Sequence, residues 1–195
     1  MEKLTSADLY TLEEYARIRP DFRAKVMAHK QDRQVPVGPH VTLYFEDRLT
    51  MHYQVQEMLR AERIFEAEGI AEELATYNPL IPDGSNLKAT LMIEYMDPAE
   101  RQRALTQLKG IEDRVWMSVT GFERVWAVAD EDLEREDETK TSSVHFVRFE
   151  LTPEMIQAVS ASAAMAVGIE HHAYTYRVEP LSQSVRGALV GDFKT

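Results

Sequence analysis

A carboxylate within an apolar helical stripe is the sequence feature with the clearest chemical consequence. Apolar residues recur at intervals of four and three between Met51 and Phe65, and Glu62 falls on this stripe. A carboxylate in such a place loses hydration unless a cation, hydrogen-bond donors or a metal ion compensates it. Two interpretations are open: Glu62 is buried and tuned for acid–base chemistry, or it lies at the helix edge and is solvated, as most charged side chains are.

Other polar residues could complete a pocket around Glu62. The same helix carries a polar face, the turn before it contains an acidic and a basic residue, and the segment NPLIPDGSN (78–86) is rich in turn residues. Backbone amides near Gly84 and Ser85, together with Arg48 or Lys88, could hold a small anionic ligand. The alternative for this segment is a purely structural connection. The candidate pocket comprises Glu46, Arg48, Gln54, Glu57, Arg60, Glu62, Asn78, Asp83, Asn86 and Lys88. We expect Arg48 or Lys88 to be the charge partner of Glu62.

Six histidines permit a metal site, but their spacing does not preform one. His40, His145 and the pair His171–His172 lie near the ends of expected strands, with Glu46 or Glu170 as possible oxygen ligands. No two of these histidines share a helical turn or alternate along a strand, so any convergence would be tertiary. The chain has no Cys, which excludes disulfides, thiolate metal sites, iron–sulfur ligation and cysteine nucleophiles. We therefore expect no cofactor and no stoichiometric iron or zinc, with His40, His145 and His171 as the weak candidates for metal ligands.

Composition favours one globular domain spanning residues 1–195. The chain is 44% apolar and 28% charged, as in ordinary folded proteins. The formal net charge of −11 disfavours nucleic acid and anionic membrane surfaces as partners. The N-terminus has no apolar segment typical of a signal peptide, and no window is long enough to cross a bilayer, so a cytoplasmic location is expected. Common nucleotide-binding, zinc-protease, serine-hydrolase and EF-hand motifs are absent.

Periodicity and turn residues predict an α+β fold, a mainly antiparallel sheet packed with helices. Thr50 is expected to cap the long central helix, and another helix to end near Pro20, with a second beginning at Asp21. Short connections such as Thr120–Gly121 require antiparallel neighbours. Residues 130–140 are expected to be an acidic, mobile connection. Expected helices cover 5–20, 22–29, 50–65, 70–77, 98–108, 153–162 and 182–190; expected strands cover 41–46, 87–95, 114–119, 123–128, 144–151 and parts of 166–176. The strand residues expected in the core are Val41, Leu43, Phe45, Val115, Met117, Val125, Val144, Phe146, Phe149 and Leu151.

Three segments carry a family resemblance: VTLYFEDRLTMHYQVQEMLRAERI (41–64), YNPLIPDGSN (77–86) and HFVRFELTPEM (145–155). Over nearly the whole chain they resemble domain of unknown function family 3501, a group of uncharacterised bacterial proteins. The resemblance implies a gene neighbourhood, because genes of this family often lie beside genes for rubrerythrin-like proteins and for iron–sulfur proteins similar to heterodisulfide reductase subunits. The resemblance therefore implies a redox or oxidative-stress setting, and it implies no catalytic residue.

Two classes of function remain open. One is an accessory protein of a redox system that binds a redox partner protein or a small anionic ligand. The other is a metal-dependent or acid–base enzyme that combines Glu46, Glu57 and Glu62 with a histidine from a strand end. A structural homodimer is a third possibility. A concave pocket with convergent polar groups would favour the ligand or the enzyme, and an exposed apolar patch would favour a protein partner.

Overall fold

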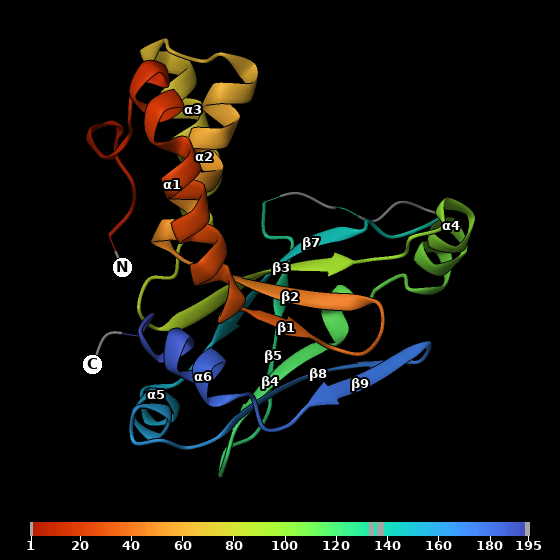
Figure 1. Ribbon diagram of the computed structural model, residues 1–195. Coiled ribbons are helices and arrows are strands. Elements are labelled where there is room, and N and C mark those ends of the chain that lie inside the picture. Colours follow the sequence, from red (N-terminus) through yellow and green to blue (C-terminus); the bar gives the residue numbers. More distant parts are fainter. Residues whose placement is uncertain (1, 133–134, 136–138, 194–195) are drawn as a thin grey trace.

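Two antiparallel sheets form the body of the protein in the computed structural model, which describes residues 2–132, 135 and 139–193 (Figure 1). Sheet A has the order β1 (Gln34–Pro36), β2 (Val41–Glu46), β3 (Asn86–Ile93), β7 (Val144–Glu150) and β6 (Val128–Ala129). Sheet B has the order β5 (Val125–Trp126), β4 (Val115–Val119), β8 (Met165–His171) and β9 (Tyr174–Val178). The expected α+β fold is confirmed, and so is the hairpin at Thr120–Gly121, because Met117 pairs with Val125.

The main core lies between the two sheets. Alternate residues of β2, β3 and β7 point toward sheet B, and those of β4 and β8 point toward sheet A. Seven of the ten predicted core residues are buried: Val41, Leu43, Phe45, Val115, Met117, Phe149 and Leu151. Val125, Val144 and Phe146 are only partly buried. In β7 the inward residues are His145, Val147 and Phe149, so Val144 and Phe146 face the other side of the sheet.

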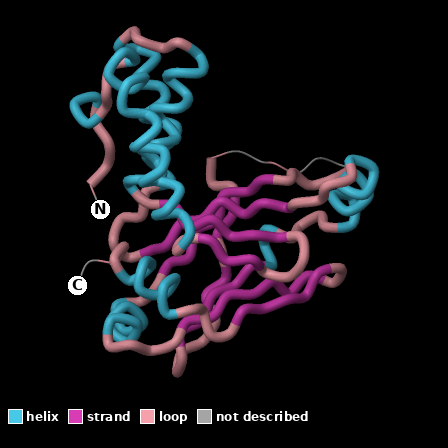
Figure 2. The backbone as a smooth tube through the Cα atoms, in the orientation of Figure 1, coloured by secondary structure: helices cyan, strands magenta, loops and turns pink. Residues whose placement is uncertain are grey.

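Three helices rise together from one end of sheet A and form a helical arm (Figures 1 and 2). They are α1 (Leu12–Gln31), α2 (Arg48–Glu62) and α3 (Ala67–Tyr77). The arm has a small core of its own, formed by Leu4, Met51, Val55, Leu59, Leu74 and Ile81. Helix α2 is capped by Asp47, whose side chain accepts a hydrogen bond from the backbone N–H of Thr50, so the predicted cap at Thr50 is wrong by one turn.

Pro20 does not end the first helix, contrary to the prediction from sequence. Helix α1 runs without interruption from Leu12 to Gln31 and is capped by Thr11. A proline removes the hydrogen bond to the carbonyl four residues earlier, which here belongs to Ala16. Both Ala16 and Pro20 are exposed, so water can satisfy that carbonyl and the helix tolerates the proline.

The remaining helices cover the ends of the sheets. Helix α4 (Pro98–Gln107) lies at one end, and α5 (Pro153–Ser160) and α6 (Gln183–Val190) lie together at the other (Figure 1). The described residues also form three short 3₁₀ helices, η1 (Ser6–Asp8), η2 (Asn78–Leu80) and η3 (Glu112–Arg114). Strand β1 lies outside all the strands expected from the sequence. Within the described residues, no helix is both long enough and apolar enough to cross a bilayer.

A buried arginine ties the arm to the C-terminal segment. Arg33 is 2% exposed, and its guanidinium donates to the carbonyl oxygens of Phe45 (3.0 Å) and Glu46 (3.1 Å) and pairs with the carboxylate of Asp192. Asp47 lies 3.4 Å away and also contacts His29. Burial is the main reason that the pKa of Asp192 is raised to about 6.

Candidate functional site

Glu62 is exposed, so the prediction that it faces inward is wrong. The buried residues of α2 include Met51, Val55 and Leu59, which recur every four residues. The helix ends at Glu62, and Arg63 adopts a left-handed conformation with φ of 57°. The apolar stripe therefore stops one turn before Glu62, and Phe65 beyond it is 70% exposed.

Glu57 belongs to an ion-pair cluster within the arm. Its two carboxylate oxygens accept hydrogen bonds from the guanidinium of Arg19, each at 2.7 Å, and the Tyr15 hydroxyl donates to it at 2.6 Å. The Arg19 hydrogen bond is the main reason that the pKa of Glu57 is lowered to about 2. Arg60 is exposed and Gln54 is half-buried. Of the polar face predicted for this helix, Glu57 therefore joins α2 to α1.

Glu46 and Arg48 are also engaged in structural contacts. The Glu46 carboxylate is 6% exposed and accepts hydrogen bonds from the hydroxyls of Thr50 (2.6 Å) and Thr90 (2.7 Å). Arg48 pairs with Asp8 at 2.5 Å. Among the described residues, no hydrogen bond or ion pair joins Glu62 to Arg48 or Lys88.

The 78–86 segment is anchored by its own polar side chains. The Asn78 amide exchanges two hydrogen bonds with the backbone of Leu4, at 2.8 and 2.9 Å. Asp83 accepts hydrogen bonds from Ser85, and Asn86 donates to Glu150 at 3.2 Å. These contacts fix the segment between the N-terminal residues and sheet A, as expected for a rigid turn-rich loop.

A cavity of about 640 Å³ lies where this segment and α3 meet the outer face of sheet A. Its residues are Ala75, Thr76, Tyr77, Pro79, Leu80, Lys88, Glu131, Asp132, Arg135, Phe146, Val147 and Arg148. Lys88 is the one predicted pocket residue among them. The others of the ten lie elsewhere, so the structure does not bring the predicted cluster together around Glu62.

Lys88 is half-buried in this cavity, and its Nζ donates to the carbonyl oxygen of Pro79. Burial is the main reason that its pKa is lowered. Nearby, Lys3 Nζ donates to the carbonyl oxygens of Asn78 (2.9 Å) and Ile81 (2.7 Å), and its pKa is lowered by burial and then by the charge of Lys88. Two ammonium groups thus lie close together on a molecule of net charge −11.

Arg148 stands directly opposite Lys88 across the β3–β7 pair. Its guanidinium forms two hydrogen bonds with the Glu131 carboxylate, at 2.8 and 2.9 Å, and one with Glu150 at 2.6 Å. Arg135 lies over the ring of Phe146, 4.5 Å from its centroid. The cavity lining therefore combines an aromatic ring with three cationic groups and with the Glu131 and Asp132 carboxylates that pair with the two guanidinium groups.

His40 and His171, two of the three candidate metal-binding histidines, each contact nearby groups of the protein. The His40 ring stacks on Tyr95 with centroids 3.9 Å apart. His171 lies 3.0 Å from the carbonyl oxygen of Lys109, and burial lowers its pKa. The main-chain N–H of Ala173 donates to its other ring nitrogen at 3.2 Å.

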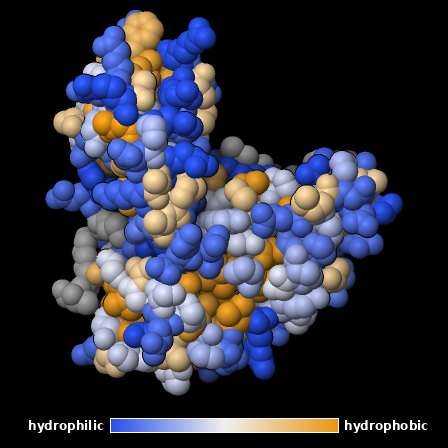
Figure 3. Space-filling view, viewed as in Figure 1, coloured by the Kyte–Doolittle hydropathy of each residue, from blue (hydrophilic) through white to orange (hydrophobic). Residues whose placement is uncertain are grey.

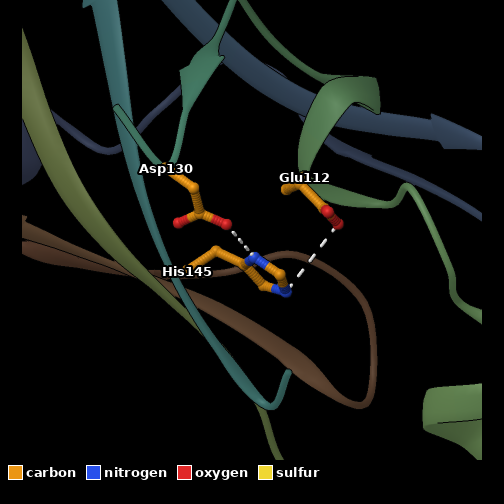
Figure 4. A group of neighbouring side chains, drawn as sticks. All are labelled: Glu112, Asp130 and His145. Atoms are coloured by element: carbon orange, nitrogen blue, oxygen red, sulfur yellow. Dashed lines mark hydrogen bonds and ion pairs between the residues drawn. The ribbon is translucent and has the colours of Figure 1, made fainter. Parts of the chain in front are cut away.

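His145 is completely buried and contacts oxygen atoms on both sides of its ring (Figure 4). Its Nδ1 lies 2.6 Å from Oδ2 of Asp130. Its Nε2 lies 2.9 Å from the Thr141 hydroxyl and 3.7 Å from Oε2 of Glu112. The sequence predicted none of these three partners, because they come from separate segments and no spacing links them.

The acidic connection expected at 130–140 lies partly outside the described residues. Its described members are engaged in contacts: Asp130 with His145, Glu131 with Arg148, and Asp132 with Arg135 at 2.6 Å. Asp130 has a left-handed backbone with φ of 49°, held by hydrogen bonds with both main-chain groups of Phe146 at 2.8 and 2.9 Å.

Comparison with known proteins gives a consistent result. The model of the family described as "Protein of unknown function (DUF3501)" matches residues 3–193. A crystal structure of a protein of unknown function from Burkholderia pseudomallei is similar, with 47% sequence identity and a TM-score of 0.95, covering 99% of this chain and 100% of that one. Among curated proteins, none matches this chain. The chain therefore belongs to the DUF3501 family, as the resemblance of its three segments indicated.

Proposed function

We propose that this protein binds a small anion with an apolar portion in the cavity between the helical arm and sheet A. The observation that carries the proposal is Lys88, a half-buried ammonium group that donates its hydrogen bond to the neutral carbonyl oxygen of Pro79. Among the described residues, none forms an ion pair with it. A desolvated cation beside a cavity gains most from an anionic ligand.

The size and lining of the cavity suit a small molecule. About 640 Å³ falls within the range of ordinary ligand pockets, which run from roughly 300 to 1,000 Å³. Tyr77, Leu80 and Phe146 offer apolar and aromatic surface on which a ring or short chain can pack. The ligand we infer is therefore a carboxylate or phosphate ester of an aromatic or short aliphatic group.

Arg148 supplies a second anchor for the anion. Its bidentate contact with Glu131 demonstrates that its guanidinium is oriented to hold a planar pair of oxygens. The Glu131 side chain is 53% exposed, so a ligand can replace it at low desolvation cost. A larger cavity of about 920 Å³ lies beside α5, but its lining includes Asp83 and Glu154 and no basic residue, which disfavours an anion there.

Isothermal titration at low ionic strength tests this proposal, with phenyl phosphate and inorganic phosphate as probes. The wild type should bind phenyl phosphate more tightly than phosphate, because the ring buries apolar surface. Lys88→Gln should weaken binding about 10- to 100-fold, the value of a charge-assisted hydrogen bond. Lys25→Gln is the matched control, since it removes the same charge from an exposed site on α1. Equal affinity in the wild type and Lys88→Gln would contradict the proposal.

The redox setting implied by the family resemblance stays a prediction. The family description and the similar crystal structure name no activity. An accessory role in a redox system is compatible with ligand binding, since the anion could be a metabolite of that system. Partner proteins and homodimer formation likewise stay predictions.

A further inference from the structure

The surroundings of His145 Nε2 point to a second site. Three oxygen atoms face this nitrogen: the Thr141 hydroxyl at 2.9 Å, the Ser142 carbonyl at 3.1 Å and the Glu112 carboxylate at 3.7 Å. The Thr141 hydroxyl and the Glu112 carboxylate are 3.4 Å apart. A neutral hydroxyl, a carbonyl and a carboxylate are all possible ligands of a divalent metal ion, and imidazole is the usual nitrogen ligand.

We propose that His145 Nε2 and Glu112, with the Thr141 hydroxyl and the Ser142 carbonyl, bind a divalent first-row transition-metal ion. Bonds of about 2.1 Å place neighbouring ligand atoms roughly 3.0 Å apart in octahedral geometry and roughly 3.4 Å apart in tetrahedral geometry. Four of the six separations among these donor atoms are hydrogen-bond or ion-pair distances, and they run from 2.9 to 3.7 Å. The donor atoms are thus spaced as the ligands of one ion are, with only small adjustments required.

Asp130 acts in this proposal as a positioning residue. Its carboxylate lies 2.6 Å from Nδ1 of His145, on the side of the ring opposite Glu112 (Figure 4). A carboxylate that accepts a hydrogen bond from the Nδ1–H group keeps the proton on Nδ1. The lone pair of Nε2 is then free to bind a metal, and the ring orientation is fixed, as in many metal sites. Asp130 is itself held by the main chain of Phe146. The imidazole is therefore oriented before any ion arrives.

Burial supports a metal ion over a solvated arrangement. His145 is 0% exposed, Thr141 is 1% exposed and Glu112 is 8% exposed. At this depth the donor atoms are shielded from water, and the Arg135 guanidinium, 3.2 Å from Oδ1 of Asp130, offsets the charge of the carboxylate that orients the ring. The rival arrangement is an imidazolium that donates from Nδ1 to Asp130 and from Nε2 to the Ser142 carbonyl. The proposal also departs from the expectation, based on histidine spacing, that no metal is bound.

Zinc binding to the full chain, after dialysis against a chelator, distinguishes the two arrangements. We expect one zinc ion per chain by elemental analysis after gel filtration. In the nitrogen NMR spectrum of the imidazoles, Nε2 of His145 should take a metal-bound shift while Nδ1 keeps its proton. This measurement uses the wild type, so it does not depend on whether any variant folds. A His145 ring that stays doubly protonated in the presence of zinc would overturn the proposal.

The zinc affinities of single-residue variants test where the zinc ion binds. Glu112→Gln should weaken zinc binding at least about tenfold, and Asp130→Asn about 10- to 100-fold, as expected for a residue that orients a ligand. His172→Gln is the control, because His172 is exposed and its ring centroid lies 4.1 Å from that of the buried His171. If His172→Gln binds zinc as tightly as the wild type does, the result supports the buried site. Loss of zinc in His172→Gln with retention in Glu112→Gln would show surface binding only and overturn the proposal.

Discussion

Asp130 and Glu131 are neighbours in the chain, yet their side chains serve opposite faces of strand β7. Asp130 contacts His145, which faces sheet B, whereas Glu131 pairs with Arg148, which faces the helical arm. The alternation of side chains along a strand produces this division. The dipeptide thus contributes to both proposed sites: Asp130 orients the histidine of the metal site, and Glu131 lines the anion cavity.

Glu57→Gln should destabilise the protein, whereas Glu62→Gln should not. The pKa of Glu57 is lowered to about 2 by Arg19 and Tyr15, so folding favours its ionised form. Its contribution is present above the ordinary carboxyl pKa and is lost as pH falls through about 2. Its side chain is 24% exposed, and solvent screening leaves about 1 kcal/mol of unfolding free energy at pH 7. Urea denaturation from pH 7 to pH 2 measures this difference.

Glu62→Gln is the matched control on the same helix, because Glu62 is exposed. Its unfolding free energy should stay within about 0.5 kcal/mol of the wild type. A larger loss in Glu62→Gln than in Glu57→Gln would contradict the assignment of Glu57 as the structural carboxylate.

Two glycine substitutions should change stability in opposite directions. A Cβ at Gly168 would lie 2.4 Å from the ring of Trp116, so Gly168→Ala should destabilise by about 1 to 3 kcal/mol. Gly187 lies exposed within α6, and nothing is within 4 Å of its Cβ position. Gly187→Ala should therefore stabilise by about 0.5 to 1 kcal/mol through helix propensity. Chemical denaturation of Gly168→Ala checks the packing of Trp116 in sheet B, and that of Gly187→Ala checks the open surface of α6. A Gly168→Ala variant as stable as the wild type, or a destabilised Gly187→Ala variant, would contradict the corresponding assignment.

Asp192 should make stability depend on pH between about 4 and 6. Burial raises its pKa to about 6, above the ordinary value of 3.8, so folding favours the protonated form. Its stabilising effect is present below the ordinary pKa and is lost as pH rises through about 6. Relative to Asp192→Asn, the wild type should lose up to about 3 kcal/mol over this interval, at about 1.4 kcal/mol per pKa unit. If the wild type instead gains stability relative to Asp192→Asn over this interval, the attraction between Asp192 and Arg33 outweighs the cost of burying the Asp192 carboxylate.

The elements of sheet A were predictable where alternation was clear. Strand 41–46 is confirmed with its bounds, because Val41, Leu43 and Phe45 alternate with polar residues and a capped helix follows. The helix break at Pro20 was wrong, because an exposed proline costs a hydrogen bond that water replaces. The prediction placed Glu62 on the buried face, because it assumed that the apolar residues of this helix are spaced alternately by four and three. The buried residues Met51, Val55 and Leu59 are instead spaced by four and four, which leaves Glu62 off the buried face.

The sites were less predictable than the strands. Lys88 was identified from its position after a rigid loop, and it does line a cavity. Arg148 and Phe146 were not, because only strand pairing brings them beside Lys88. His145 was recognised as a weak metal candidate, but Glu112, Asp130 and Thr141 converge on it from three segments. Such convergence is tertiary and has no sequence period.

Backbone amide NMR during titration with phenyl phosphate tests the central claim most directly, because it reports where the anion binds in solution. The account predicts that the largest shifts fall on Tyr77, Leu80, Lys88, Phe146 and Arg148, and that Lys88→Gln abolishes them at the same ligand concentration. Shifts that gather instead beside α5, at Gly84, Ser85 and Gln157, or that persist in Lys88→Gln, would contradict it.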